Sequence, residues 1–419
     1  MFRSALLLSA AAVGALAATS AQAQVEVPFW HSLTRAGEEV ILTLEQRFEE
    51  QHPDIDIQPV YVGDYDDMIT RLQAAAVAGD VPALAQLEIT RYGLFADAGA
   101  LEPLDARLES EPAILEDLRG FAREAALYLG ESYVLPFNTS TPVMYYNRDA
   151  LAAAGLDPDA PPATWDELLA AAEALTVRNG DEVAQWGIAA PPQWVRWAMA
   201  NQAGGGWMDG ATNEIQMGMP ETARAYQFAA DWVNVHEVAQ LDGAIDERAA
   251  RQSFVGGQTA IMFGSTGSLG NIAGDVAFDL GVAPLPCERT CAAPIGGAAL
   301  GIMAAAEPEQ KDGAWEFLRF VMTPEANAVM FTVTGYLPIL HSTVEEPTAA
   351  DYLAARPEYR VAIEQLDVAF ARARPPAMPE IRALEPSVWE AIVLQQRTAE
   401  EALADFAEDM AEMMAASGS

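Results

Sequence analysis

The fold is decided near the amino terminus by residues 25–62, which read VEVPFWHSLTRAGEEVILTLEQRFEEQHPDIDIQPVYV. Their hydrophobic pattern predicts a buried strand at Val25 to Trp30, an amphipathic helix at Glu38 to Glu50 and a second strand at Ile55 to Val62. Working outward, a helix, an apolar strand and a further helix follow at Asp66 to Ala78, Ala83 to Leu87 and Thr90 to Asp97. This alternation predicts an α/β fold with a parallel sheet covered by helices.

The segments that follow the predicted strands are the first places to look for a binding site. Parallel sheets bind ligands at the carboxyl ends of their strands, where the chain loops out. These segments are Trp30 to Ser32, Gly63 to Tyr65, and Glu88.

Composition limits the classes of partner. The chain has 419 residues, with 23 Lys and Arg against 61 Asp and Glu, a formal net charge of −38. At about 100–200 residues per domain, this length indicates two or three domains. A field this negative repels phosphates, so nucleic acid and anionic membrane surfaces are not expected as partners.

The first 23 residues have the features of a secretory signal peptide. A short basic start at Arg3 is followed by an apolar run from Ala5 to Ala18 and by an A-x-A cleavage site at Ala21 to Ala23. The mature chain is then expected to begin near Gln24 and to be exported to the periplasm. A membrane anchor is the weaker alternative, because the apolar run is short.

Two cysteines, Cys287 and Cys291, lie close together in the segment PCERTC. In an exported protein this spacing favours a disulfide that closes a small loop. A metal site would need further ligands, and no histidine is nearby in the sequence.

The sequence has none of the common catalytic motifs. It lacks G-x-x-x-x-G-K-[ST], H-E-x-x-H and G-x-S-x-G, and its four histidines show no ligand spacing. We therefore expect binding without catalysis, and neither a cofactor nor a metal.

Several polar segments are typical of recognition sites, although each also has a structural explanation. Asn138 to Pro142 is rich in hydroxyls but could be an ordinary turn. Gly264 to Ser268 precedes a predicted helix and suits an anion, but a plain helix cap explains it as well. Ile295 to Ala298 allows close backbone approach, or a tight strand crossing. The remaining candidates are Trp194 and Trp197, which could line a site or belong to the core; Tyr336 in a loop; and Arg382, which follows a proline-rich segment.

These residues resemble the extracytoplasmic solute-binding proteins of bacterial ABC importers. The resemblance runs from about Val25 to Met410 and lies in the carbohydrate-binding group that includes maltose-binding proteins. Within that group, the chain is most similar to the branch that binds sn-glycerol-3-phosphate. The segments that carry the resemblance are PFWHS (28–32), NTSTPVMYYN (138–147), GSL (267–269), IGGA (295–298), TGYLPI (334–339) and MPEIR (378–382).

The resemblance implies a set of ligand-binding residues. The phosphate-binding set of the family falls on Ser140, Ser265, the backbone of Gly297, Tyr336 and Arg382. The glycerol side falls on Tyr65, a stacking Trp194 and an acid at Glu88. In the family this acid follows an aromatic residue, whereas Glu88 follows Leu87.

The resemblance also implies the architecture and the role. We expect a two-lobe α/β binding protein of the maltose-binding type, with a hinge and a ligand cleft between the lobes. The first lobe would hold residues 24–137 and 300–334, and the second 138–299 and 335–419.

The protein would be a monomer that delivers glycerol-3-phosphate, or a glycerophosphodiester such as glycerophosphocholine, to the membrane permease. The alternatives are a binding protein for a neutral sugar or oligosaccharide and, less favoured, a secreted phosphodiesterase.

Overall fold

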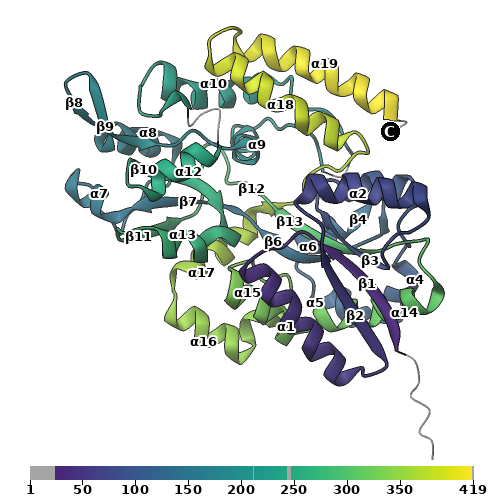
Figure 1. Ribbon diagram of the computed structural model, residues 1–419. Coiled ribbons are helices and arrows are strands. Elements are labelled where there is room, and N and C mark those ends of the chain that lie inside the picture. Colours follow the sequence, from purple (N-terminus) through teal and green to yellow (C-terminus); the bar gives the residue numbers. More distant parts are fainter. Residues whose placement is uncertain (1–23, 211, 243–246, 418–419) are drawn as a thin grey trace, which may run out of the picture.

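The computed structural model describes residues 24–210, 212–242 and 247–417. The signal peptide predicted for residues 1–23 lies outside these ranges. Two five-stranded sheets organise the described chain, and helices pack around each of them (Figure 1).

The first sheet has the strand order β2-β1-β3-β13-β6. Its strands are β1 (Val25–His31), β2 (Ile55–Tyr61), β3 (Leu84–Glu88), β6 (Leu135–Ser140) and β13 (Gly296–Ile302). Strand β1 pairs in parallel with β2 and β3, which confirms the alternation predicted from the amino-terminal sequence. Strand β13 is antiparallel to both β3 and β6, so the sheet is mixed where a parallel one was expected.

Helices connect the parallel strands as the sequence pattern requires. Helix α1 (Ala36–Gln51) buries Val40, Leu44 and Phe48 on the side that faces the sheet. Helix α2 (Tyr65–Ala78) begins at a capping box in which the Asp64 carboxylate accepts from the backbone N–H of Asp67. This cap fixes the position of Tyr65, the first residue of the helix.

The second sheet has the order β11-β7-β10-β9-β8. Its strands are β7 (Pro142–Asn147), β8 (Val177–Asn179), β9 (Glu182–Ile188), β10 (Thr259–Ser265) and β11 (Leu280–Ala283). Strand β7 follows β6 after the single residue Thr141, so the chain passes from the first sheet to the second within one residue. It returns to the first sheet just before β13.

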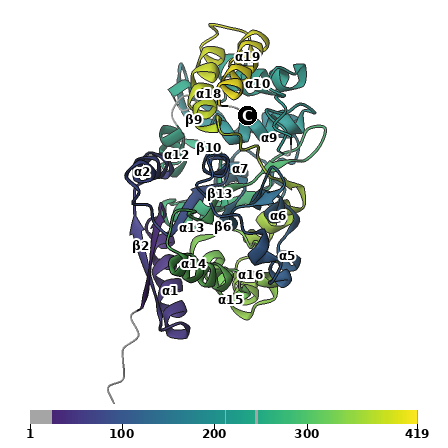
Figure 2. The ribbon, with the colours of Figure 1, turned by 90° about the vertical axis from the view of Figure 1, so that its right-hand side faces the viewer.

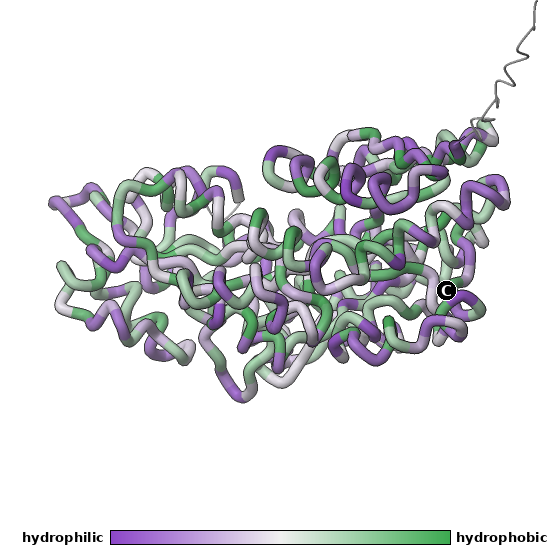
Figure 3. The backbone as a smooth tube through the Cα atoms, turned by 90° about the horizontal axis from the view of Figure 1, so that it is seen from below, coloured by the Kyte–Doolittle hydropathy of each residue, from purple (hydrophilic) through white to green (hydrophobic). Residues whose placement is uncertain are grey.

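The helices beside the second sheet include α8 (Trp165–Leu175), α9 (Gln193–Gln202), α10 (Pro220–Asn234), α18 (Met378–Val393) and α19 (Ala399–Ser417). Figure 2 shows α9, α10, α18 and α19 together on the same side of the molecule. Their apolar faces meet in a core that contains Trp197, Trp207 and Tyr226. In Figure 3 the outer helices alternate between hydrophilic and hydrophobic stretches, as expected for helices with one buried face.

After β13, helices α14 (Pro308–Val321) and α15 (Pro324–Thr334) return to the first sheet and to α1. The other described elements are α3 (Tyr92–Asp97), α4 (Asp105–Leu108), α5 (Pro112–Asp117), α6 (Gly120–Ala126), β4 (Leu127–Tyr128), β5 (Glu131–Ser132), α7 (Arg148–Ala153), α12 (Glu247–Val255), η1 (Thr266–Ser268), α13 (Leu269–Asp275), β12 (Ala293–Pro294), η2 (Ser342–Glu345), α16 (Pro347–Ala355), α17 (Glu358–Glu364), η3 (Gln365–Val368) and β14 (Ala369–Phe370).

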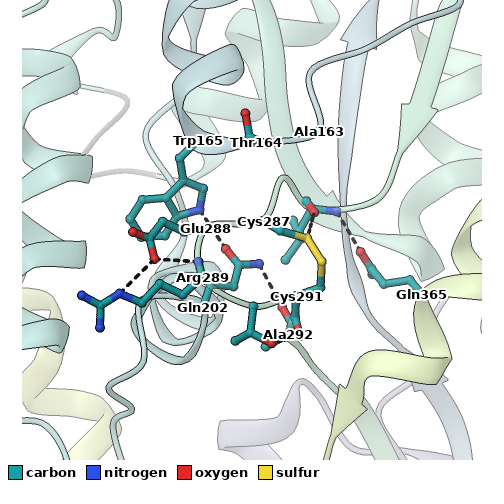
Figure 4. Close-up of a disulfide and its surroundings, with 12 residues drawn as sticks. Ala163, Thr164, Trp165, Gln202, Cys287, Glu288, Arg289, Cys291, Ala292 and Gln365 are labelled. Atoms are coloured by element: carbon teal, nitrogen blue, oxygen red, sulfur yellow. Dashed lines mark hydrogen bonds and ion pairs between the residues drawn. A yellow bond between two sulfur atoms is a disulfide. The ribbon is translucent and has the colours of Figure 1, made fainter.

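A disulfide joins Cys287 to Cys291 and closes a short loop at the end of α9 (Figure 4). The backbone N–H groups of Arg289 and Thr290 donate to the carbonyl of Gln202, the last residue of that helix. The Gln202 side chain in turn accepts from the Trp165 indole at 2.9 Å. The loop therefore supplies hydrogen-bond donors to a backbone carbonyl at the carboxyl end of α9. The Gln202 side chain connects the same end of α9 to the start of α8.

We predict that replacing both cysteines with serine lowers the free energy of unfolding by about 2 kcal/mol. The loss is modest because a disulfide that closes a short loop removes little entropy from the unfolded chain. Urea unfolding of the oxidised protein and of the double variant measures the difference. A reductant should destabilise only the unsubstituted protein, and an equal effect on both would contradict the assignment.

A buried ion pair fixes α9 against α18. Arg196 donates from Nε and Nη2 to the two carboxylate oxygens of Glu385, at 2.9 and 2.7 Å, and the Tyr226 hydroxyl donates to the same carboxylate at 2.9 Å. Both charged side chains are almost completely buried. This network sets the relative position of the two helices that carry Trp194 and Arg382.

Glu385→Gln should lower the free energy of unfolding by about 3 kcal/mol, because it leaves the Arg196 cation buried without its counterion. Glu288→Gln is the matched control, since Glu288 pairs with the partly exposed Arg224 at 3.0 Å. That exposed pair should contribute less than about 1 kcal/mol. Equal losses in the two variants would contradict the central role of the buried pair.

Candidate functional site

All eight residues predicted to bind ligand line one cavity of about 410 Å³. Residues from the first sheet and α2 form one side of it, and residues from α9, β10 and α18 form the other. The predicted residues in its wall are Tyr65, Glu88, Ser140, Trp194, Ser265, Gly297, Tyr336 and Arg382. The cavity is therefore a suitable place for a small ligand that contacts both halves of the molecule.

Gly297 and Ser140 are brought together by strand pairing. Gly296 lies opposite Ser140 and Gly297 opposite Thr139 in the antiparallel ladder of β13 and β6. Gly297 has a φ of 102°, and a Cβ atom there would lie 1.7 Å from the carbonyl oxygen of Asn138. Only glycine fits this position, so the backbone reaches the cavity wall uncovered by a side chain.

Tyr65 and Tyr336 both lie beside the Asn138 side chain in the cavity wall. The Asn138 side-chain amide donates to the Tyr65 hydroxyl at 3.2 Å. Burial raises the pKa of both Tyr65 and Tyr336. Both phenols are therefore neutral at physiological pH and can donate a hydrogen bond to a ligand.

The two tryptophans of α9 have different roles. Trp194 lies in the cavity wall, with its ring packed against Gly296. Trp197 is fully buried and stacks on Trp207, with 4.1 Å between ring centroids. The structure thus resolves the two alternatives: Trp194 faces the cavity, and Trp197 belongs to the core beneath it.

Glu88, the last residue of β3, is buried among cations and hydrogen-bond donors. Its Oε1 atom lies 2.7 Å from Arg372 Nη2 and 3.2 Å from Arg382 Nη1. Its Oε2 atom accepts from the backbone N–H and the hydroxyl of Thr90. Burial opposes ionisation of this carboxyl, but the charges of Arg372, Arg382 and Arg91 outweigh it and lower its pKa to about 2.

Arg382 connects the two sides of the cavity. It extends from the first turns of α18, and its Nη1 atom lies 3.4 Å from the Thr90 hydroxyl as well as near Glu88. Its side chain keeps 23% of its surface exposed, so part of the guanidinium still faces the cavity. This exposed part can donate to an anion.

Two arginines of the site were missed by the sequence reasoning. Arg372 and Arg91 both line the cavity, and Arg91 pairs with Asp66. One signal for Arg372 was present, because the segment 372-RAR-374 places two cations directly before the prolines that precede α18. Nothing in the local sequence indicated that Arg372 would meet Glu88.

Two further cavities adjoin the first. One of about 460 Å³ shares Asp64, Tyr65 and Tyr336 with it. Another of about 220 Å³ shares Trp194 and Ser265. The shared residues place both cavities next to the first, in the directions in which a ligand larger than glycerol-3-phosphate could extend.

Among the described residues, no group of three or more His, Cys, Asp and Glu side chains is placed to hold a metal ion. Within the same residues, every helix is too short or too polar to cross a membrane.

Comparison with known proteins agrees with this fold. The sn-glycerol-3-phosphate-binding periplasmic protein UgpB of Pectobacterium atrosepticum is 29% identical over 411 residues, which cover 93% of this chain and 91% of the relative. UgpB of Escherichia coli is also 29% identical, over 416 residues and 94% of each chain.

Two solved structures have the same fold as this chain. UgpB from Mycobacterium tuberculosis, in complex with glycerophosphocholine, superposes with a TM-score of 0.82 and 28% identity, covering 93% of this chain and 98% of the other. The maltose-bound MalE3 of T. maritima, at 22% identity, shares the fold with a TM-score of 0.77 and covers 93% of this chain and 100% of the other. The predicted two-lobe α/β fold of the maltose-binding type is confirmed.

A family model described as bacterial extracellular solute-binding protein matches residues 31–328. The chain belongs to the family of bacterial extracellular solute-binding proteins.

Proposed function

We propose that this protein is the substrate-binding subunit of an ABC importer and captures sn-glycerol-3-phosphate or a glycerophosphodiester such as glycerophosphocholine. The observation that carries the proposal is the gathering of Arg382, the hydroxyls of Ser140, Ser265 and Tyr336, and the partly exposed backbone of Gly297 in one cavity. The similarity to UgpB proteins along nearly the whole chain supports the same ligand class.

The phosphate end of the ligand would lie against Ser140, Ser265, Gly297, Tyr336 and Arg382. Hydroxyls and a backbone N–H donate single hydrogen bonds, and a guanidinium can donate two in parallel to phosphate oxygens. Hydrogen bonds to a charged group contribute about 1.5–3 kcal/mol each. Several of them are sufficient for micromolar or tighter binding once the cost of ordering is included.

The glycerol end would lie against Tyr65, Trp194 and Glu88. The Trp194 ring offers an apolar surface for the carbon chain, and the Tyr65 phenol donates a hydrogen bond. A carboxylate at Glu88 repels a phosphate placed in the reverse orientation. These contacts would give the ligand one direction in the cavity.

The ligand would contact both lobes and so favour the closed form of the protein. The first lobe would hold residues 24–137 and 300–334, and the second 138–299 and 335–419. The closed form would dock on the transmembrane permease, which carries out transport. In this role the protein acts in the periplasm after removal of residues 1–23, as a monomer and without catalysis.

Calorimetry with glycerol-3-phosphate, glycerophosphocholine and maltose, side by side, tests the ligand class. We expect at least one of the two phosphate compounds to bind with a Kd of about 10 μM or tighter and maltose to show no binding. Tight binding of maltose without binding of either phosphate compound would instead support a neutral sugar as the ligand. Release of an alcohol from glycerophosphocholine during the titration would support a phosphodiesterase.

Arg382→Ala should weaken binding of the phosphate compounds by about 10- to 100-fold, because it removes charge-assisted hydrogen bonds. Arg397→Ala is the matched control, since Arg397 is a partly exposed arginine that pairs with Asp405. Calorimetry of both variants should show a loss for Arg382→Ala alone. Unchanged affinity of Arg382→Ala for glycerol-3-phosphate would contradict the proposed phosphate site.

A further inference from the structure

Glu88 and Arg372 form a buried ion pair that the proposed contact of Glu88 with glycerol does not explain. Arg372 Nη2 lies 2.7 Å from Glu88 Oε1, and the two side chains are only 3% and 6% exposed. The residues are 284 positions apart in the sequence. Glu88 ends β3, whereas Arg372 lies in the segment between β14 and α18, so the pair connects distant parts of the chain in the cavity wall.

Donors from the protein already occupy the Glu88 carboxylate. Thr90 donates from its backbone N–H and its hydroxyl to Oε2, at 2.9 and 2.5 Å. Arg372 and Arg382 both lie against Oε1. Because a carboxylate has about four acceptor positions, these contacts use most of its capacity in this arrangement. Besides any contact with glycerol, Glu88 is placed to hold cations.

Arg372 and Arg382 also share an aromatic surface. Their guanidinium carbons lie 5.6 and 5.8 Å from the ring centroid of Trp197. Two cations this close repel each other, and the Glu88 carboxylate and the face of Trp197 offset that repulsion. The three charged groups therefore behave as one unit.

The backbone of Arg372 is fixed by Arg374. Arg374 donates from Nη1 to the Arg372 carbonyl at 2.7 Å, and its other nitrogens donate to the carbonyls of Leu127 and Glu124 at 2.7 and 2.8 Å. Within the described part of the chain, the buried Arg372 Nε atom has no hydrogen-bond partner. An unsatisfied buried donor costs stability, so the position of Arg372 is better explained by the site than by folding energy.

On these contacts, and resting on the proposed function, we propose that Arg372 is a positioning residue that neutralises the Glu88 carboxylate and leaves Arg382 available to bind the anionic ligand. Without Arg372, Glu88 Oε1 would pair with Arg382 alone. The guanidinium of Arg382 would then be drawn toward β3 and away from the ligand.

A double-mutant cycle with Arg372→Met and Glu88→Gln tests this role. The probe is glycerophosphocholine, because a phosphate monoester changes charge near pH 6 whereas a diester does not. We expect Arg372→Met to weaken binding about tenfold, since Arg382 would then have to balance more of the Glu88 charge. Adding Glu88→Gln should restore the affinity to within about threefold of the unsubstituted protein. Additive losses in the double variant would overturn the proposal and favour direct contact of Glu88 with glycerol.

The pH dependence of binding gives a readout that a purely structural role would not change. The groups that face Glu88 are Arg91, Arg372, Arg382, Thr90 and Tyr65, and Arg91 also pairs with Asp66. In the unsubstituted protein the pKa of Glu88 is about 2, so its effect on affinity should be constant from neutral pH to about pH 4.5.

In Arg372→Met, loss of a cation raises the pKa of Glu88, so protonation begins at a higher pH. Each protonated Glu88 releases Arg382, so binding should tighten as the pH falls toward the raised pKa of Glu88. A loss of affinity that is the same at every pH would overturn the proposal.

Two further variants test whether affinity depends on a cation at position 372 in particular or only on the net charge of the cavity wall. Arg372→Lys retains the cation and should keep most of the affinity. Arg91→Met removes a cation whose Nε lies 3.9 Å from Glu88 Oε2, and Glu88→Gln should not rescue it. Equal rescue in the Arg91 and Arg372 backgrounds would overturn a specific role for Arg372.

Thermal unfolding followed by circular dichroism establishes that each variant is folded. If the unsubstituted protein binds neither glycerophosphocholine nor glycerol-3-phosphate, the proposed function itself fails. Normal binding with an additive cycle rejects only the role of Arg372.

Discussion

One carboxylate organises the centre of this molecule. Glu88 ends a strand of the first sheet, and cations from α18 and from the segment before it converge on its oxygens. Burial alone would make this acid neutral, but three guanidinium groups stabilise its ionised form. Since Arg372 and Arg382 belong to chain segments beyond residue 369, their attraction to Glu88 joins the carboxyl-terminal part of the protein to the first sheet.

The local charge explains how a strongly acidic protein can hold an anion. The chain carries a formal net charge of −38. The cavity, in contrast, is lined by three arginines and three carboxylates, so its wall is close to neutral. Remote carboxylates are screened beyond about 8 Å at physiological salt, whereas Arg382 acts at contact. Net charge therefore limits macromolecular partners without excluding one small phosphate.

A rigid frame supports these charges. Helix α9 is fixed at both ends, by the Arg196–Glu385 pair near its start and by the disulfide loop at its end. Its middle carries Trp197, whose ring lies against both Arg372 and Arg382. Ordered support of this kind lowers the entropy lost on ligand binding, because the binding groups are already in place.

The sequence by itself determined the strand–helix alternation, because burial on one face and capping chemistry act over a few residues. The eight proposed ligand-binding residues came from its resemblance to a known family, and the structure gathers them around one cavity. Only the tertiary structure decided that β13 returns antiparallel between β3 and β6 and that Arg372 meets Glu88. Neither could be derived from the local sequence, because strand pairing and ion pairing both depend on which distant segments meet in space. Glu88 and Arg372, for example, are 284 residues apart.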